Sequence, residues 1–352
     1  MKKTQYIILI TLHLSLITLL TSCEKVSPIG VLVAGTGVED RVMMSNIYFQ
    51  QQKGDYYHFS VDADEYTFLV GADSHMTTDA GRMEEMFQIG LDNNDLLYAH
   101  LGDIADTKAE YYVNLDNVVR KYKKKYGQKY YKEIYLGDDE NVSQLNNDDY
   151  YVYVDTITNN VYDVNTVPFP FFPVVGNHDI THNGWALWSN IFHSSFYSFY
   201  VYIAMEGHNS YYDHFIFLDT ANGTLGQEQV DLIEAGVLDD KSFEDAGIYT
   251  RNTFVFSHTN IFRPSSLQFA STFPREETLF LLNQFVKWNT SIVFCGHVHK
   301  WDEQEVGGVH YITLDSMSER NSPGPGDYLV RVHVKKDGTI TWERVHMNYT
   351  VK

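Results

Sequence analysis

The stretch Phe171–Asp179 has the sequence FFPVVGNHD. An apolar run from Phe171 to Val175 is followed directly by a glycine and then by Asn177, His178 and Asp179. Short apolar runs that are rich in aromatic and β-branched residues predict buried strands. The stretch therefore predicts a buried strand that ends in polar side chains suited to chemistry.

Four other apolar runs have the same form and also end in aspartate or histidine. They are Tyr66 to Asp73, Asp95 to Asp103, Asn252 to His258 and Ser291 to His297. Segments with the apolar spacing of helices lie between the runs: Met83 to Leu91, Leu115 to Tyr122, Val230 to Val237 and Arg275 to Trp288. This alternation of strands and helices predicts an α/β layered fold. Near the C-terminus, Asp337-Gly338 lies between two apolar runs and predicts a β-hairpin.

The chain between Asp103 and Asn177 is longer than a single connecting helix requires. Asn159-Asn160 lies there between two strand-like runs, which predicts a hairpin within an insertion at about residues 126–168. The basic run Arg120 to Lys125 allows two interpretations, a nucleic-acid contact or the solvated end of a helix. We favour the helix end, because cations suit the negative end of a helix dipole.

The composition restricts the partners of the protein. The 352 residues suit one large domain or two small ones, and the formal net charge is −20. Such a charge repels phosphate backbones, so general nucleic-acid binding is disfavoured, whereas a small anionic substrate is allowed if bound metal ions reverse the local charge. The 26 tyrosines fit aromatic strands, with stacking on sugars or nucleobases as the alternative.

The N-terminus has the features of an export signal. Lys2 and Lys3 precede an apolar stretch, Tyr6 to Leu20, that is shorter than the ~20 residues needed to span a bilayer. It ends at Leu20-Thr21-Ser22-Cys23, which resembles a bacterial lipobox; the alternative is an ordinary signal peptide with a chance cysteine. We predict a signal peptide at 1–22, a lipid on Cys23, a tether and lead-in segment at 23–62 and the main domain at 63–352. The predicted location is the bacterial cell envelope, with the exported protein anchored to a membrane by its lipid. The other cysteine, Cys295, lies in an apolar run and is predicted to be buried.

Five short motifs follow the predicted strands and carry the chemistry. They are Asp73-Ser74-His75, Gly102-Asp103-Ile104-Ala105-Asp106, Gly176-Asn177-His178-Asp179, Ser257-His258 and Gly296-His297-Val298-His299. Their carboxylate, imidazole and amide groups suit divalent ions such as Mn²⁺, Zn²⁺ or Fe. Short loops at one edge of a sheet would bring these groups together, and one carboxylate would bridge two metals about 3.5–4 Å apart.

As an ordered set, these motifs resemble the signature of the calcineurin-like metallophosphoesterase superfamily. The resemblance implies a four-layer αββα sandwich, here with a hairpin insertion, and a pair of divalent metal ions. It implies one metal bound by Asp73, His75, Asp103 and His299, and another bound by Asp103, Asn177, His258 and His297. A hydroxide that bridges the metals would attack phosphorus, His178 would be the general acid and Asp106 would orient it. Asp106 stands where the purple acid phosphatases have a ligating tyrosine, so similarity to that branch is not expected.

The function implied is hydrolysis of a small phosphomonoester or phosphodiester. The alternatives are a non-catalytic surface lipoprotein that keeps the fold as a binding module, and a lipoprotein that binds glycans through its tyrosines. Arg263, five residues after His258, would either clamp a substrate phosphate or be a loop cation. His100 is expected to be a hydrogen-bonded core residue, and Asp219 and Asn222 are expected to form a turn.

Overall fold

The structure is a computed structural model. It describes residues 37–52, 58–106, 108–135, 151–163, 165–203, 211–239, 248–262, 273–318 and 328–348. Arg263, Cys23 and the predicted signal peptide lie outside these ranges. No helix of the described part is both long and apolar enough to cross a membrane.

Two β-sheets form the centre of the molecule. The larger has the strand order β1-β8-β9-β10-β11-β13-β12, and the smaller has the order β15-β14-β2-β3-β7. The strands of the larger sheet are β1 (His58–Val61), β8 (Tyr197–Ile203), β9 (Tyr211–Leu218), β10 (Tyr249–Ser257), β11 (Thr290–Cys295), β12 (Asp302–Val306) and β13 (Val309–Thr313). Those of the smaller sheet are β2 (Glu65–Gly71), β3 (Leu97–His100), β7 (Phe171–Pro173), β14 (Tyr328–Lys335) and β15 (Ile340–His346). The predicted motifs follow five of these strands. In the smaller sheet, β3 pairs in parallel with both β2 and β7, and in the larger sheet β10 pairs in parallel with β11.

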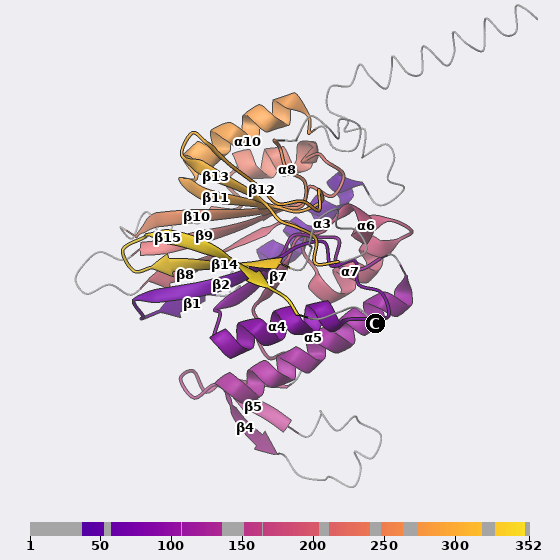
Figure 1. Cartoon of the computed structure of the whole chain (residues 1–352), viewed down its shortest axis with the longest axis vertical. Helices are drawn as coiled ribbons and strands as arrows, with labels where there is room; N and C mark the ends of the chain where they lie inside the picture. Colours follow the sequence, from indigo (N-terminus) through magenta and orange to yellow (C-terminus); the bar gives the residue numbers. More distant parts are fainter. Residues whose placement is uncertain are drawn as a thin grey trace, which may run out of the picture.

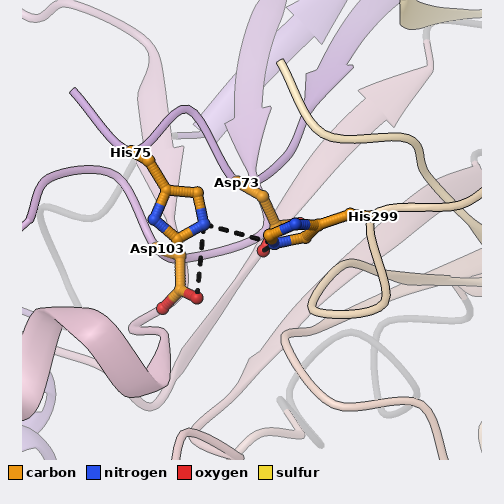
Figure 2. A group of neighbouring side chains, drawn as sticks. All are labelled: Asp73, His75, Asp103 and His299. Atoms are coloured by element: carbon orange, nitrogen blue, oxygen red, sulfur yellow. Dashed lines mark hydrogen bonds and ion pairs between the residues drawn. The ribbon is translucent and has the colours of Figure 1, made fainter. Parts of the chain in front are cut away.

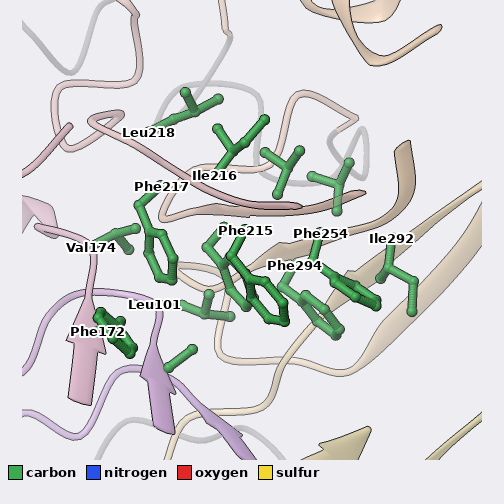
Figure 3. Close-up of a cluster of buried hydrophobic side chains, with 14 of the residues drawn as sticks. Leu101, Phe172, Val174, Phe215, Ile216, Phe217, Leu218, Phe254, Ile292 and Phe294 are labelled. Atoms are coloured by element: carbon green, nitrogen blue, oxygen red, sulfur yellow. The ribbon is translucent and has the colours of Figure 1, made fainter. Parts of the chain in front are cut away.

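The two sheets pack face to face through aromatic side chains. In Figure 3, side chains of the larger sheet lie above two side chains from the other side of the core. The upper ones are Phe215, Phe217, Phe254 and Phe294; the lower ones are Leu101, directly after β3, and Phe172 of β7. Successive side chains of a strand point to opposite faces, so Ile216 and Leu218 of the same strand point away from this layer. Burial of these large rings between the sheets supplies much of the hydrophobic stabilisation of the fold.

Helices cover the outer face of each sheet, which gives four layers (Figure 1). On the smaller sheet, α4 (Gly81–Asn93), α5 (Ala109–Tyr130) and α7 (Gly184–Phe192) bury an apolar cluster that includes Phe87, Leu115 and Trp188. On the larger sheet, α8 (Gly226–Glu234) and α10 (Arg275–Lys287) contribute Ile233, Leu281 and Phe285 to the main core. The αββα sandwich predicted from the sequence is therefore confirmed.

The hairpin predicted around Asn159-Asn160 is also present. β5 (Tyr151–Val154) pairs antiparallel with β6 (Val161–Tyr162), and β4 (Lys132–Tyr135) adds a third strand on the other side of β5. This small sheet belongs to neither of the central sheets and lies beyond α5 in Figure 1. The ring of Tyr153 packs against Gly127 of α5, where a Cβ atom would lie 2.8 Å from it.

The lead-in segment 23–62 contains two elements that the sequence patterns do not predict. They are helix α3 (Val38–Gln52) and strand β1, which pairs in parallel with β8. Arg41 of α3 is fully buried and forms an ion pair with Asp219, with Nη2 and Oδ1 2.7 Å apart, and it donates to Asn222 Oδ1 over 2.7 Å. The expected turn role of Asp219 and Asn222 is thus incomplete, because both also anchor α3. The compact domain begins before residue 63.

Candidate metal centre

Each predicted metal-binding residue follows a strand at the same edge of the sandwich. Asp73 and His75 follow β2, Asp103 follows β3, and Asn177 begins the short helix α6 (Asn177–Ile180) after β7. In the larger sheet, His258 follows β10, and His297 and His299 follow β11. The loops are tied together by backbone hydrogen bonds, such as His75 N to Asp103 O (3.0 Å) and Gly296 N to His258 O (3.0 Å). Parallel strands therefore bring ligands from distant parts of the sequence to one place.

Five of these seven residues have a backbone conformation that is rare outside glycine. Their φ angles are positive: Asp73 50°, His75 42°, Asp103 51°, His297 68° and His299 56°. Such left-handed conformations in non-glycine residues cost on the order of 1–3 kcal/mol each and concentrate at functional sites. The fold thus retains local strain that serves to aim these side chains.

The close approach of the loops also requires glycine. A Cβ atom at Gly176 would lie 2.1 Å from the backbone nitrogen of Asp103 and 2.2 Å from its Oδ1. Gly102 adopts φ of +88°, which glycine takes up without strain. Glycine therefore permits the close approach of the two loops at position 176 and the left-handed backbone at position 102.

The first group of side chains comprises Asp73, His75, Asp103 and His299 (Figure 2). Nε2 of His75 lies 3.2 Å from Nε2 of His299 and 3.9 Å from Oδ2 of Asp103. Nε2 of His299 lies 3.3 Å from Oδ1 of Asp73. Asp73 is fully buried; although burial raises its pKa, the hydrogen bond with His299 and the neighbouring imidazoles hold that pKa below its usual value.

The second group comprises Asp103, Asn177, His258 and His297. Nε2 of His258 lies 2.9 Å from Oδ1 of Asn177, 3.1 Å from Nδ1 of His297 and 3.5 Å from Oδ2 of Asp103. Oδ2 of Asp103 is therefore close to a histidine of each group, His75 and His258. Its other oxygen, Oδ1, accepts a hydrogen bond of 2.7 Å from the backbone N–H of His178. Asp103 is the one carboxylate in both groups, the position required of a bridging ligand.

The hydrogen bonds of two histidines show which nitrogen is free to bind a metal. Nδ1 of His258 lies 2.7 Å from the carbonyl oxygen of Leu101, which can only accept, so Nδ1 carries the proton. Nδ1 of His75 lies 3.2 Å from Oδ1 of Asp106, a carboxylate oxygen that also accepts, so Nδ1 of His75 carries the proton as well. In the neutral rings, Nε2 of each then presents a lone pair to the centre of its group. A histidine whose other N–H is held by a carbonyl or carboxylate is the usual arrangement of a metal ligand.

These contacts fit metal ions better than they fit hydrogen bonds. Nε2 of His258, with its lone pair, and Oδ1 of Asn177 are both acceptors, yet they lie only 2.9 Å apart. Acceptors that share an ion at about 2.0–2.2 Å from each lie close together in this way. The imidazole and carboxylate donors suit Zn²⁺, Mn²⁺ or Fe. The residues present therefore fit divalent metal ions.

Asp106 and His178 lie beside the first group. Oδ1 of Asp106 is 3.5 Å from Nδ1 of His178, whose side chain is 49% exposed and so faces solvent next to the buried ligands. The hydrogen bond with Asp106 raises the pKa of His178 to about 9, against the opposing effect of burial. The same hydrogen bond and that with His75 lower the pKa of Asp106. His178 is thus an exposed imidazole beside the buried ligands, and Asp106 favours its protonated form.

Two supporting residues have no role assigned from the sequence: Asp179, the last residue of the Gly-Asn-His-Asp motif, and Thr220, which lies outside the motifs. Asp179 is fully buried and accepts hydrogen bonds from the backbone N–H groups of Gly176 (2.9 Å) and Ile104 (3.1 Å) and from the hydroxyl of Tyr112 (3.1 Å). Thr220 Oγ1 accepts from the N–H groups of His258 and Thr259, both over 3.0 Å. Asp179 therefore joins two ligand loops, and Thr220 fixes the loop of His258.

His100 differs from its expected role. It is fully buried in β3, and burial lowers its pKa to about 3, so the ring is neutral. Neither ring nitrogen has a hydrogen-bond partner among the described residues. The expectation of a hydrogen-bonded core histidine is therefore wrong as to the hydrogen bond and right as to the burial.

No family model matches the sequence, and no curated protein matches it either. Several solved structures are similar over most of this chain. GAP50, the anchor in the inner membrane complex of Plasmodium, has 12% identity and a TM-score of 0.45, with 82% of this chain and 90% of that chain covered. A dimetal phosphatase from Danio rerio has 10% identity and a TM-score of 0.44, with 80% of this chain and 99% of that chain covered. YfcE, a phosphoesterase from E. coli, has 12% identity and a TM-score of 0.31, with 80% of this chain and 100% of that chain covered.

Proposed function

We propose that this protein is a metal-dependent phosphoric ester hydrolase of the calcineurin-like metallophosphoesterase type, with a phosphomonoester or phosphodiester as substrate. The observation that carries the proposal is the meeting of seven ligand-type side chains in two adjacent groups that share Asp103. The unprotonated Nε2 atoms of His75 and His258 point into those groups.

The seven ligands would form two metal sites that share Asp103. Asp73, His75, Asp103 and His299 would hold one ion, and Asp103, Asn177, His258 and His297 the other. When bound, two such ions supply a water that ionises near neutral pH and positive charge that offsets the charge of the phosphate. The negative net charge of the chain is compatible with an anionic substrate for this reason.

His178 would donate the proton that the leaving oxygen needs. General acids of this kind contribute typically 10²–10⁴-fold to the rate. Neighbouring cations push an imidazole towards the neutral form, whereas the carboxylate of Asp106 favours the protonated form. The contact between Oδ1 of Asp106 and Nδ1 of His178 supports this pairing.

The test is turnover of 4-nitrophenyl phosphate and bis(4-nitrophenyl) phosphate by purified protein, before and after treatment with a chelator. We expect activity that the chelator removes and that Mn²⁺, Zn²⁺ or Fe²⁺ restores. His297→Gln should abolish it, whereas His333→Gln, a matched change on β14 away from the site, should not. Turnover that survives complete metal removal would contradict the metal-dependent mechanism. No turnover with any of the metals would favour the non-catalytic binding module.

We also propose that the protein is exported and attached to a membrane through a lipid on Cys23. Support comes from the sequence alone: the basic start, the short apolar stretch and the cysteine that ends it. The intact mass of protein purified from membranes should correspond to a chain that starts at a lipidated Cys23. A mass with an unmodified cysteine would refute the proposal.

A further inference from the structure

A large cavity lies apart from the metal centre. It has a volume of about 750 Å³, and none of the seven proposed metal ligands lines it. Its walls come from the end of α3, the middle of α5, the end of α7 and the segment from the β5–β6 hairpin to β7. The volume falls in the range of about 300–1,000 Å³ that is typical of sites for small organic ligands.

Aromatic rings and amide groups form much of this lining. Tyr48 of α3 and His193 after α7 stack with their ring centres 4.6 Å apart and their planes at 22°. Tyr162 of the hairpin also lines the cavity, as do the amide side chains of Gln52 and Asn190. Flat rings pack against sugar faces, and amides exchange hydrogen bonds with hydroxyl groups because each offers both donors and an acceptor.

The cavity also contains two cations from the basic run of α5. Arg120 and Lys123 line it, with Asp116 as the one carboxylate among the lining residues. Burial, together with the charge of Lys123, lowers the pKa of His193, which favours the neutral form of this ring. Two cations and one carboxylate leave a net charge of +1, in a chain whose net charge is −20. The cavity therefore favours an anion that most of the surface repels.

The two cations converge on one point of the wall. Nζ of Lys123 donates to the backbone carbonyl of Asn165 over 3.0 Å, and Nη1 of Arg120 donates to the side-chain oxygen of the same residue. Burial lowers the pKa of Lys123, against the opposing effects of Asp116 and Asp163, so its ammonium group is partly stripped of water. Asp163 also interacts with Arg120. A carboxylate bound beside Asn165 would give both cations a further charged partner.

We propose that this cavity binds a short acidic oligosaccharide, with a sugar carboxylate at Arg120 and Lys123 and a sugar ring against the Tyr48–His193 stack. A net charge of +1 matches a singly charged carboxylate better than a doubly charged phosphate. The dispersed amides match the many hydroxyl groups of a sugar. The basic run of α5 thus has a ligand-binding role beyond that of a helix end.

The test is calorimetric titration of the full chain with trigalacturonic acid, with its methyl ester as an uncharged counterpart and with AMP. We expect saturable binding of the acid and at least tenfold weaker binding of the ester and of AMP. Lys123→Met should weaken binding of the acid at least tenfold. Lys121→Met should not, because Lys121 lies on the same helix but pairs with Glu84 outside the cavity. If Lys123→Met does not fold, as judged by thermal unfolding, Arg120→Gln makes the same test.

The variant Asp103→Asn distinguishes binding in this cavity from binding at the metal centre, and it should bind the acid as the wild type does. AMP is also titrated into this variant, because AMP is a phosphate ester that an intact metal centre would bind. Four results would overturn the proposal: no saturable binding of the acid, equal binding of acid and ester, tighter binding of AMP than of the acid by Asp103→Asn, or loss of acid binding in Asp103→Asn. Hydrolysis is not measured, so these outcomes do not depend on the proposed hydrolase function.

Discussion

Oδ1 of Asp106 lies 3.2 Å from Nδ1 of His75, a proposed metal ligand. The same oxygen is 3.5 Å from Nδ1 of His178, the proposed general acid. The two imidazole rings meet nearly at right angles, with their centres 4.7 Å apart. One carboxylate therefore holds a metal ligand in the tautomer that binds metal and also favours the protonated form of the acid.

This double role predicts two separate defects in Asp106→Asn. Loss of a carboxylate behind a metal-binding histidine typically lowers metal affinity 10–100-fold, and we expect this for the ion held by His75. The pKa of His178, raised to about 9 by Asp106, should fall. The acid acts only while protonated, that is, below its pKa, so the alkaline fall in rate on a poor leaving group should move to lower pH. Metal titration and pH–rate profiles at saturating metal measure the two effects; an unchanged profile would exclude the second role.

The role of His178 as an acid predicts a dependence on the leaving group. In His178→Ala, turnover of an alkyl phosphate should fall by about 10²–10⁴-fold, while turnover of a nitrophenyl ester, whose leaving group needs no proton, should be largely retained. Metal analysis should show that the variant binds as much metal as the wild type. Equal losses on both esters would mean that His178 positions the phosphate instead.

The buried ion pair of α3 predicts a large effect on stability. Arg41→Met leaves Asp219 buried without its cation, which typically destabilises a protein by about 3–5 kcal/mol. Lys121→Met, which removes an exposed pair with Glu84, should change stability by no more than about 1 kcal/mol. Chemical denaturation of both variants provides the comparison. Similar small losses in the two would mean that α3 is not anchored through Arg41.

The contact of Gly176 with Asp103 predicts that even one methyl group is harmful there. Gly176→Ala would push Cβ into the backbone of Asp103, and we expect a loss of about 1–3 kcal/mol in stability together with weaker metal binding. Gly37→Ala is a suitable control, since its Cβ would lie 4.0 Å from the nearest atom. Thermal unfolding and metal analysis would show the difference, and normal metal content in Gly176→Ala would contradict it.

The strand-end motifs could be predicted from the sequence because each is a local pattern: an apolar strand followed at once by Asp, Asn or His. The hairpin at Asn159-Asn160 could also be predicted from a local pattern, a turn dipeptide between two strand-like runs. Helix α3 could not be predicted in this way, because its anchor joins Arg41 to Asp219, 178 residues away in the chain. The contact between Asp106 and His75 likewise depends on how two loops meet. For Arg263 and Cys23, which lie outside the described residues, the sequence predictions stand as proposals.

Metal content per chain measures directly whether Asp103 is shared between two metal ions. The charge of Asp103 would offset part of the repulsion between the ions, so the loss of this residue should affect both. Elemental analysis of the purified, metal-loaded protein should find two ions per chain in the wild type. Asp103→Ala should retain almost none, whereas variants of a ligand to one ion, such as His299→Ala, should retain more metal than Asp103→Ala. Two ions in Asp103→Ala, or fewer than two in the wild type, would contradict the bridging role of Asp103.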